Sequence, residues 1–214
     1  MTRSMRTCVA AFATTLAFLS PCYGGVIHDE SVNGDLSSTF SAPTQLSLNF
    51  GSNQIFGSTG PQGAGLPPDR DYFSITLTAG HPVVLIRVLE GTTGDGAGAE
   101  VSFLGLTAGA MINPAGATAA GLLGYYLFGP ADIGQDILDN LAISNTNPQG
   151  FGAAQGFTPP LGPGTFSFWV QDGNALIDYR LELFVVPEPA SIVLVGIGWG
   201  ALLLRRRRSG KQVG

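Results

Sequence analysis

The sequence predicts a mainly β protein, built as an antiparallel β-sandwich, on three observations. Gly (31 residues) and Pro (14 residues) are abundant, and both weaken helix interiors while favouring turns. Seven short segments have the alternating or continuously apolar character of strands. Turn signals separate them, such as Ala79-Gly80, Pro163-Gly164 and Asp172-Gly173-Asn174. Several short strands joined by such turns are typical of a sandwich.

Most of the predicted strands alternate, so that every second side chain faces the core. The segment 82–90 is instead nearly continuously apolar, as expected for a strand that is buried on both faces. One segment, 132–141, has helical spacing in Ile133, Ile137 and Leu141, and an irregular loop explains it equally well. The predicted strands are 44–50 (Leu46, Leu48 and Phe50 inward), 71–78 (Phe73, Ile75 and Leu77 inward), 82–90, 101–106, 122–128, 165–171 (Phe166, Phe168 and Val170 inward) and 178–186 (Tyr179, Leu181, Leu183 and Val185 inward).

Residues 1–24 have the three regions of a secretory signal peptide. Arg3 and Arg6 give a positive start, residues 7–19 are apolar and uncharged, and Pro21 ends the helix before small residues. We expect signal peptidase and the secretion machinery to act on this segment, with cleavage between Gly24 and Gly25. An uncleaved anchor is the alternative, although the apolar run is short for a membrane span. Residues 25–186 are then the exported domain.

The C-terminus carries a second targeting pattern in residues 187–214. Pro187, Glu188 and Pro189 precede an apolar run, 190–204, which predicts a single transmembrane helix. Four arginines follow at once and would keep that end on the cytoplasmic side of the membrane. They are Arg205, Arg206, Arg207 and Arg208.

This order of tripeptide, apolar helix and arginine cluster resembles the PEP-CTERM sorting tail of Gram-negative bacteria. The resemblance implies that Pro187, Glu188 and Pro189 are the recognition motif of an exosortase, while the helix and Arg205–Arg208 hold the motif at the membrane. It also implies a transient stay in the inner membrane, followed by the cell surface or an extracellular matrix rich in exopolysaccharide, as in a biofilm. A plain single-span anchor is the alternative.

The exported domain carries a second resemblance, in residues 69–81 and in 162–173 with 178–183. These blocks resemble the signature strand and the closing hairpin of bacterial pre-peptidase C-terminal domains. The resemblance implies a jelly-roll-like sandwich, and such domains often bind calcium or extracellular polymers.

Charge and cysteine content exclude several classes of function. Residues 25–186 contain three arginines and fourteen acidic residues, a formal charge of −11, so a nucleic-acid partner is not expected. Cys8 and Cys22 both lie in the predicted leader. The mature domain therefore has no disulfide, thiol nucleophile or cysteine-ligated metal.

Two groups of oxygen-bearing side chains are candidate Ca²⁺ ligands, since Ca²⁺ takes six to eight oxygens. A D-x-D-x-D-G loop is missing, so we favour the alternative that these residues cap strands and keep the surface soluble, and we assign no metal or cofactor. The calcium hypothesis requires the two groups to converge in the fold. The first group is Asp29, Glu30, Asn33 and Asp35 near the mature N-terminus, and the second is Asp69 and Asp71 before a strand.

No catalytic constellation emerges from the sequence. His28 and His81 are the only histidines and have no metal-ligand or triad spacing, and no G-x-S-x-G elbow is present. The aromatic side chains of Trp169, Tyr125, Tyr126 and Tyr179 could form a sugar-stacking platform, although a role in the core is favoured. The leading hypothesis is a non-enzymatic surface or matrix protein. The alternatives are a carbohydrate- or calcium-binding module and a secreted hydrolase.

Overall fold

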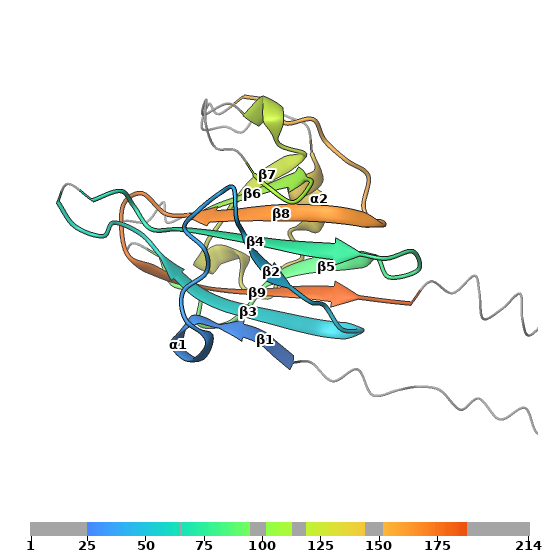
Figure 1. Ribbon diagram of the computed structural model, residues 1–214, viewed down its shortest axis with the longest axis horizontal. Helices are drawn as coiled ribbons and strands as arrows, with labels where there is room; N and C mark the ends of the chain where they lie inside the picture. The colour runs from blue at the N-terminus through green and yellow to red at the C-terminus, as the bar shows by residue number, and fades with distance from the viewer. Residues whose placement is uncertain (1–24, 65, 95–101, 113–118, 144–151, 188–214) are drawn as a thin grey trace, which may run out of the picture.

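The computed structural model describes residues 25–64, 66–94, 102–112, 119–143 and 152–187, and these form two β-sheets with little helix (Figure 1). The predicted signal peptide 1–24 and transmembrane helix 190–204 lie outside the described residues. Within the described ranges, no helix is long and apolar enough to span a membrane.

The four strands of the first sheet lie in the order β1-β3-β9-β5 and the five strands of the second in the order β2-β4-β8-β6-β7. The first sheet consists of β1 (Gly25–Asp29), β3 (Gly51–Thr59), β9 (Ile177–Val185) and β5 (Val83–Val88). The second consists of β2 (Thr44–Leu46), β4 (Arg70–Leu77), β8 (Gly164–Gln171), β6 (Ser102–Ala108) and β7 (Gly124–Phe128).

Both sheets are mixed, which corrects the prediction of a wholly antiparallel fold. The edge strand β1 pairs parallel to β3, and the edge strand β2 pairs parallel to β4, while the other pairs are antiparallel. The reason lies in the chain path, because the first four strands alternate between the two sheets. Along the sequence, a strand of the other sheet therefore separates the two members of each parallel pair, so a tight hairpin cannot join them.

One hydrophobic core is shared by the two sheets, and it confirms the predicted inward faces of β4, β8 and β9. Phe73 of β4 stacks on Phe168 of β8 with ring centroids 4.8 Å apart, and both are almost wholly buried. Leu183 of β9 reaches the same core from the other sheet. Each such side chain contributes about 1.5–3 kcal/mol through burial, so the core dominates the stability of this disulfide-free domain.

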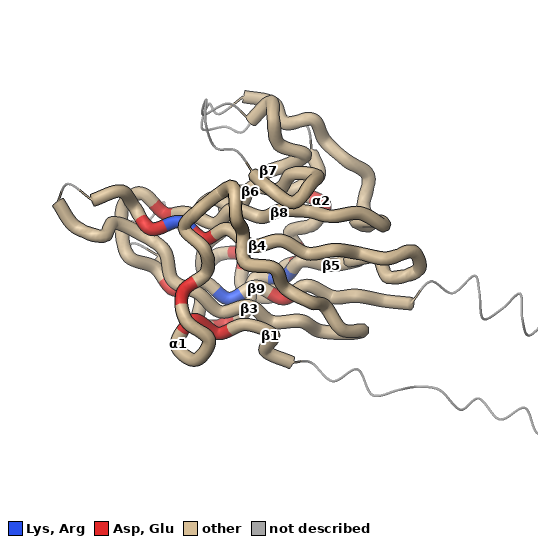
Figure 2. The backbone as a smooth tube through the Cα atoms, in the orientation of Figure 1, with Lys and Arg blue, Asp and Glu red and all other residues tan. Residues whose placement is uncertain are grey.

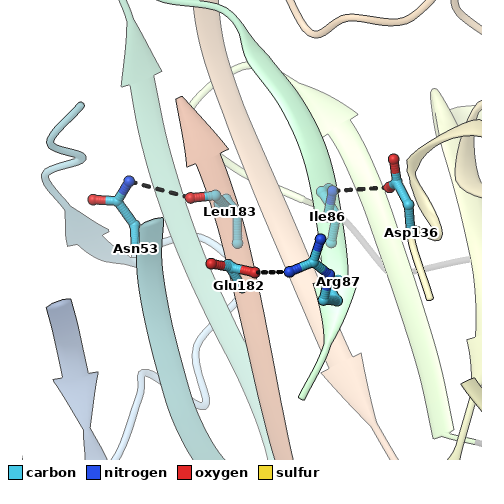
Figure 3. Close-up of polar contacts among 6 residues, drawn as sticks. All are labelled: Asn53, Ile86, Arg87, Asp136, Glu182 and Leu183. Carbon is cyan, nitrogen blue, oxygen red and sulfur yellow. Dashed lines mark hydrogen bonds and ion pairs between the residues drawn. The ribbon is translucent and has the colours of Figure 1, made fainter. Parts of the chain in front are cut away.

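The sequence patterns missed β1 and β3 and misplaced one strand. Only Thr44–Leu46 of the predicted strand 44–50 is a strand, and Phe50 is 51% exposed instead of inward. The following strand β3 begins with turn-forming residues, so the sequence pattern did not indicate a strand there. Its Asn53 is fully buried, and the side-chain amide lies within donating distance of the carbonyl oxygens of Asn49 and Gly51 and of Leu183 in β9. Figure 3 shows the bond to Leu183.

The strand β5, predicted from its apolar sequence to be buried on both faces, lies at the edge of its sheet. Val83, Ile86 and Val88 are fully buried, and its other residues are half-buried. The segment after β7 covers its open edge: the Ile86 N–H donates to the Asp136 carboxylate (3.1 Å), and the Ile137 N–H donates to the Ile86 carbonyl (2.7 Å). On its other side, Arg87 forms a 3.1 Å ion pair with Glu182 of β9 (Figure 3). Covering an edge in this way blocks pairing with other chains.

The predicted helix 132–141 is mostly an irregular segment. Only a 3₁₀ turn, η2 (Pro130–Asp132), and a short helix, α2 (Leu138–Ala142), form, and a second 3₁₀ turn, η1 (Ala119–Gly121), precedes β7. The apolar spacing reflects burial, because Ile137 and Leu141 are fully buried. Gly124 permits this packing, since a Cβ atom there would collide with the Leu141 carbonyl.

Candidate metal centre

Three carboxylates from distant parts of the sequence meet at one end of the domain. Glu30 begins the short helix α1 (Glu30–Asn33), Asp35 follows that helix, and Asp71 is the second residue of β4. One oxygen from each side chain lies within 4.8 Å of the others. Figure 2 shows acidic positions gathered around α1 and the segment that follows it. Ca²⁺ binds oxygens at 2.3–2.6 Å, so two of its ligands are at most about 5 Å apart and the cluster has the size of a calcium site.

Asp71 is buried because it continues the inward face of its strand. Side chains alternate along β4, so Asp71 points the same way as Phe73 and Ile75, into the layer between the sheets. Its exposed fraction is 0%, and neither carboxylate oxygen has a hydrogen bond of regular geometry in the described part of the chain, although the Tyr179 hydroxyl lies near enough to lower the pKa of Asp71. A buried carboxylate without a partner is costly, so such a group is either protonated or bound to a cation.

Burial and, next, the negative charge of Glu30 together raise the pKa of Asp71 to about 9. Glu30 also has a raised pKa, chiefly because it is partly buried. Without a cation, Asp71 is therefore protonated at neutral pH. A cation that binds at this site would replace the proton on the Asp71 carboxyl group.

The hydroxyl of Tyr179 faces the cluster from the opposite sheet. Tyr179 continues the inward face of β9, is 0% exposed, and has no hydrogen bond of regular geometry in the described structure. Burial raises its pKa well above the usual value, and the neighbouring Asp71 and Glu30 charges add to this shift. Its ring lies across Gly57 of β3, where a Cβ would stand 2.5 Å from the hydroxyl oxygen. Glycine at that position thus lets the hydroxyl reach the carboxylates.

The backbone fixes Glu30 in place. One carboxylate oxygen accepts from the Leu36 N–H (3.0 Å) and the other from the Ser58 N–H (2.7 Å). These bonds hold the loop after α1 against β3 and leave further lone pairs on both oxygens. Asp35 is exposed and forms the solvent side of the cluster, through which an ion and water can enter.

The predicted cation ligands therefore fall into two sets, those that converge in the fold and those that do not. Asp35 and Asp71 converge as the calcium hypothesis required, and Glu30 joins them. Asp29 does not: its carboxylate caps α1 by accepting from the Ser31 N–H (2.9 Å), while the Asn33 side chain accepts from the Asp29 N–H. The alternative that the acids only cap elements and solubilise the surface is right for Asp29 and wrong for Asp71.

Asp69 lies beside the cluster without belonging to it. Its pKa is raised by partial burial and by the charge of Asp35, and its carboxylate accepts from the Arg70 N–H. Tyr179 is the member that sequence patterns missed, because its alternation with Leu181 and Leu183 indicated a core residue and gave no sign of the polar contact.

The predicted aromatic platform does not form. Tyr179 points into the interior, and Tyr125 and Tyr126 lie on opposite faces of β7, in different hydrophobic clusters. Trp169 is half-buried opposite Phe168, as alternation predicted, and packs against Phe103 with ring centroids 4.7 Å apart. These aromatic side chains are packing residues of the two clusters.

Neither histidine pairs with a carboxylate in the portion of the chain described here. His28 on β1 is buried, and its Nε2 has no hydrogen-bond partner. His81 is hydrogen-bonded through Nδ1 to the Thr78 hydroxyl. An acid–base relay through either imidazole would need a carboxylate or nucleophile that these contacts do not supply.

The two ends of the β domain leave from the same side of the molecule (Figure 1). Gly25 begins β1 opposite Asn53, and Val185 ends β9 opposite Gly51. Pro187 is exposed, just beyond a hydrogen bond from the Val186 N–H to the Pro82 carbonyl (3.2 Å). The remaining predicted targeting residues lie outside the described residues: Gly24, Glu188, Pro189 and Arg205–Arg208.

Comparisons with protein-family models, curated proteins and solved structures find no match for this chain.

Proposed function

We propose that this protein is an exported, non-enzymatic protein of the cell surface or extracellular matrix, whose β domain binds Ca²⁺ through Glu30, Asp35 and Asp71. The observation that carries the calcium assignment is the fully buried Asp71, with two unpartnered oxygens beside two further carboxylates. A divalent cation supplies the missing partner and neutralises the cluster.

The ligand set suits Ca²⁺ better than a transition metal. It consists of carboxylate oxygens with the Tyr179 hydroxyl nearby, and it includes no sulfur or imidazole. Hard oxygen ligands favour Ca²⁺ or Mg²⁺, and Ca²⁺ accepts the irregular geometry that two separate segments provide. Bidentate carboxylates and water, entering past the exposed Asp35, complete the six to eight ligands.

Export gives this site a suitable environment. Calcium sites of extracellular modules work with dissociation constants near 10⁻⁴–10⁻³ M. The signal-peptide pattern of residues 1–24 and the sorting pattern of residues 187–214 place the acidic domain outside the cytoplasm. In this proposal an exosortase processes the tail at Pro187, Glu188 and Pro189, and the domain then resides among exopolysaccharide.

A jelly-roll-like sandwich of the pre-peptidase C-terminal type is the proposed finer fold. Two observations support it: the segments 69–81 and 162–183, which carry that resemblance, supply β4, β8 and β9, and both sheets face one core. A secreted hydrolase is less well supported, because the described contacts of His28 and His81 offer no relay.

Terbium luminescence tests the calcium assignment, because Tb³⁺ replaces Ca²⁺ and is sensitised by a tyrosine as close as Tyr179. We expect the exported protein, excited in the tyrosine band, to show saturable Tb³⁺ emission that Ca²⁺ displaces. Asp71→Asn preserves the side-chain shape and should weaken binding about 100-fold, because it removes a buried ligand charge.

Asp139→Asn is the matched control, since Asp139 is an exposed acid on α2 outside the cluster. It should bind Tb³⁺ like the wild type. Equal emission from the wild type and from Asp71→Asn would refute the assignment, since adventitious surface binding does not depend on a buried carboxylate.

A further inference from the structure

A groove of about 470 Å³ lies at the opposite end of β4 from the carboxylate cluster. The end of β2 and the turn after it form one wall, through Gln45, Ser47 and Asn49. The end of β4 and the following turn form the other, through Thr76, Thr78 and His81. Val185 closes the groove where β9 ends. Its volume lies in the range of small-molecule sites, about 300–1,000 Å³.

The groove is uncharged in a strongly acidic domain. None of the residues that line it is Asp, Glu, Lys or Arg, whereas residues 25–186 have a formal charge of −11. Figure 2 shows that the turns at this end carry no acidic or basic position. An ionic ligand would find no counter-charge here, so a charged sugar, a phosphate or an ionic peptide is not the expected occupant.

The lining instead offers hydrogen-bonding groups that are not used within the protein. The exposed side chains of Gln45, Ser47 and Asn49 form no hydrogen bond to the described part of the chain. Amides and hydroxyls can each donate and accept, which matches the hydroxyl groups of a sugar.

An aromatic surface stands beside these polar groups. Phe50 is 51% exposed and packs edge-on against the His81 imidazole, with ring centroids 4.5 Å apart. The Thr78 hydroxyl holds that imidazole through Nδ1. The imidazole in turn positions the Phe50 ring. An exposed aromatic ring at a groove provides an apolar face on which the C–H groups of a sugar ring can pack.

We propose that this groove binds a neutral saccharide segment, with Phe50 as the stacking surface and Gln45, Ser47 and Asn49 as hydrogen-bond partners. The proposal does not depend on the calcium site, because the groove lies at the β4 end that carries Thr76 and Leu77, whereas Asp71 is near the strand's start. It gives the domain a direct contact with a polysaccharide matrix.

The test uses the exported protein and four hexasaccharide probes, in calcium and again in a chelator. The neutral probes are cellohexaose, maltohexaose and mannohexaose, and the anionic probe is a hexamer of galacturonic acid. Saturation-transfer NMR and calorimetry should show binding of at least one neutral probe at millimolar concentration, with or without calcium, and weaker binding of the anionic probe. Phe50→Ala should weaken binding about tenfold or more, the cost of removing a contact worth at least 1.4 kcal/mol.

Leu176→Ala is the matched control, because Leu176 is a large, 70% exposed apolar side chain in the turn before β9, outside the groove. It should bind like the wild type. The proposal fails if no neutral probe binds, if Phe50→Ala binds as well as the wild type, or if the galacturonate hexamer binds as tightly as the neutral sugars. Circular dichroism of Phe50→Ala distinguishes a lost contact from a lost fold, and Asn49→Ala provides a second groove variant that should also weaken binding.

Discussion

Replacement of Glu188 by Ala is expected to leave the full-length chain in the membrane, whereas the wild-type protein loses its C-terminal tail near residue 187. The physical reason is the chemistry of the Pro187-Glu188-Pro189 segment. Proline restricts its own backbone and that of the residue before it, so the sequence favours an extended segment with one carboxylate as its only charged group. Pro187, the one residue of this motif within the described ranges, is exposed.

Intact mass and cell fractionation in an exosortase-bearing host measure this outcome. Glu90→Ala is the control, since Glu90 is an exposed acid in the turn after β5, and the tail of this variant should be removed as in the wild type. If the wild type and Glu188→Ala both keep residues 190–214 in the membrane, the tail is only an anchor. The placement of the protein in an extracellular matrix then loses its main support.

The stability of the calcium-free domain is expected to fall as the pH rises from about 5 to 8.5. The pKa of Asp71 is about 9 in the folded protein, against 3.8 for the ordinary side chain. The folded state therefore holds a proton that the unfolded chain has released. The proton's stabilising contribution is complete below about pH 4 and is lost progressively until the pH passes about 9. The expected slope is about 1.4 kcal/mol of unfolding free energy per pH unit.

Chemical denaturation at several pH values, in a chelator and in excess Ca²⁺, measures this dependence. Calcium should flatten it, because the cation replaces the proton and stabilises the ionised carboxylate. Asp71→Asn should flatten it without calcium, since an amide does not titrate. A wild-type slope that matches the Asp71→Asn slope in the chelator would contradict the assignment of a buried, protonated Asp71.

Alternation predicted the parts of the fold in which one strand face is apolar. Phe73, Phe168 and Leu183 lie inward as expected, because a period of two leaves no other way to bury them. The same patterns missed β3, where a buried Asn53 takes the place of an apolar residue and satisfies three carbonyls. They also missed β1 and predicted antiparallel pairing for β2, which pairs parallel to β4. A local pattern does not show that the chain alternates between the two sheets.

For the candidate site, the sequence predicted which acidic residues are available but not that they meet in the fold. Acidic residues near positions 30 and 70 were visible in the sequence, but their convergence depends on α1 folding back against β3 and on β4 lying in the other sheet. The burial of Asp71 follows from its register with Phe73, which could have been noticed from alternation alone. The approach of Tyr179 could not, because it depends on Gly57 being its cross-strand neighbour.

Calorimetric titration of the purified protein with Ca²⁺ at pH 7, in two buffers of different ionisation enthalpy, tests the calcium centre most directly. We expect one saturable site per chain, and about one proton released for each ion bound, because Asp71 must lose its proton to become a ligand. Asp71→Asn should weaken Ca²⁺ binding about 100-fold, so that the saturable heat is lost from the titration range, and the proton release should be lost with it. A titration without saturable heat, or saturable binding that Asp71→Asn leaves unchanged, would show that Glu30, Asp35 and Asp71 do not form a calcium centre.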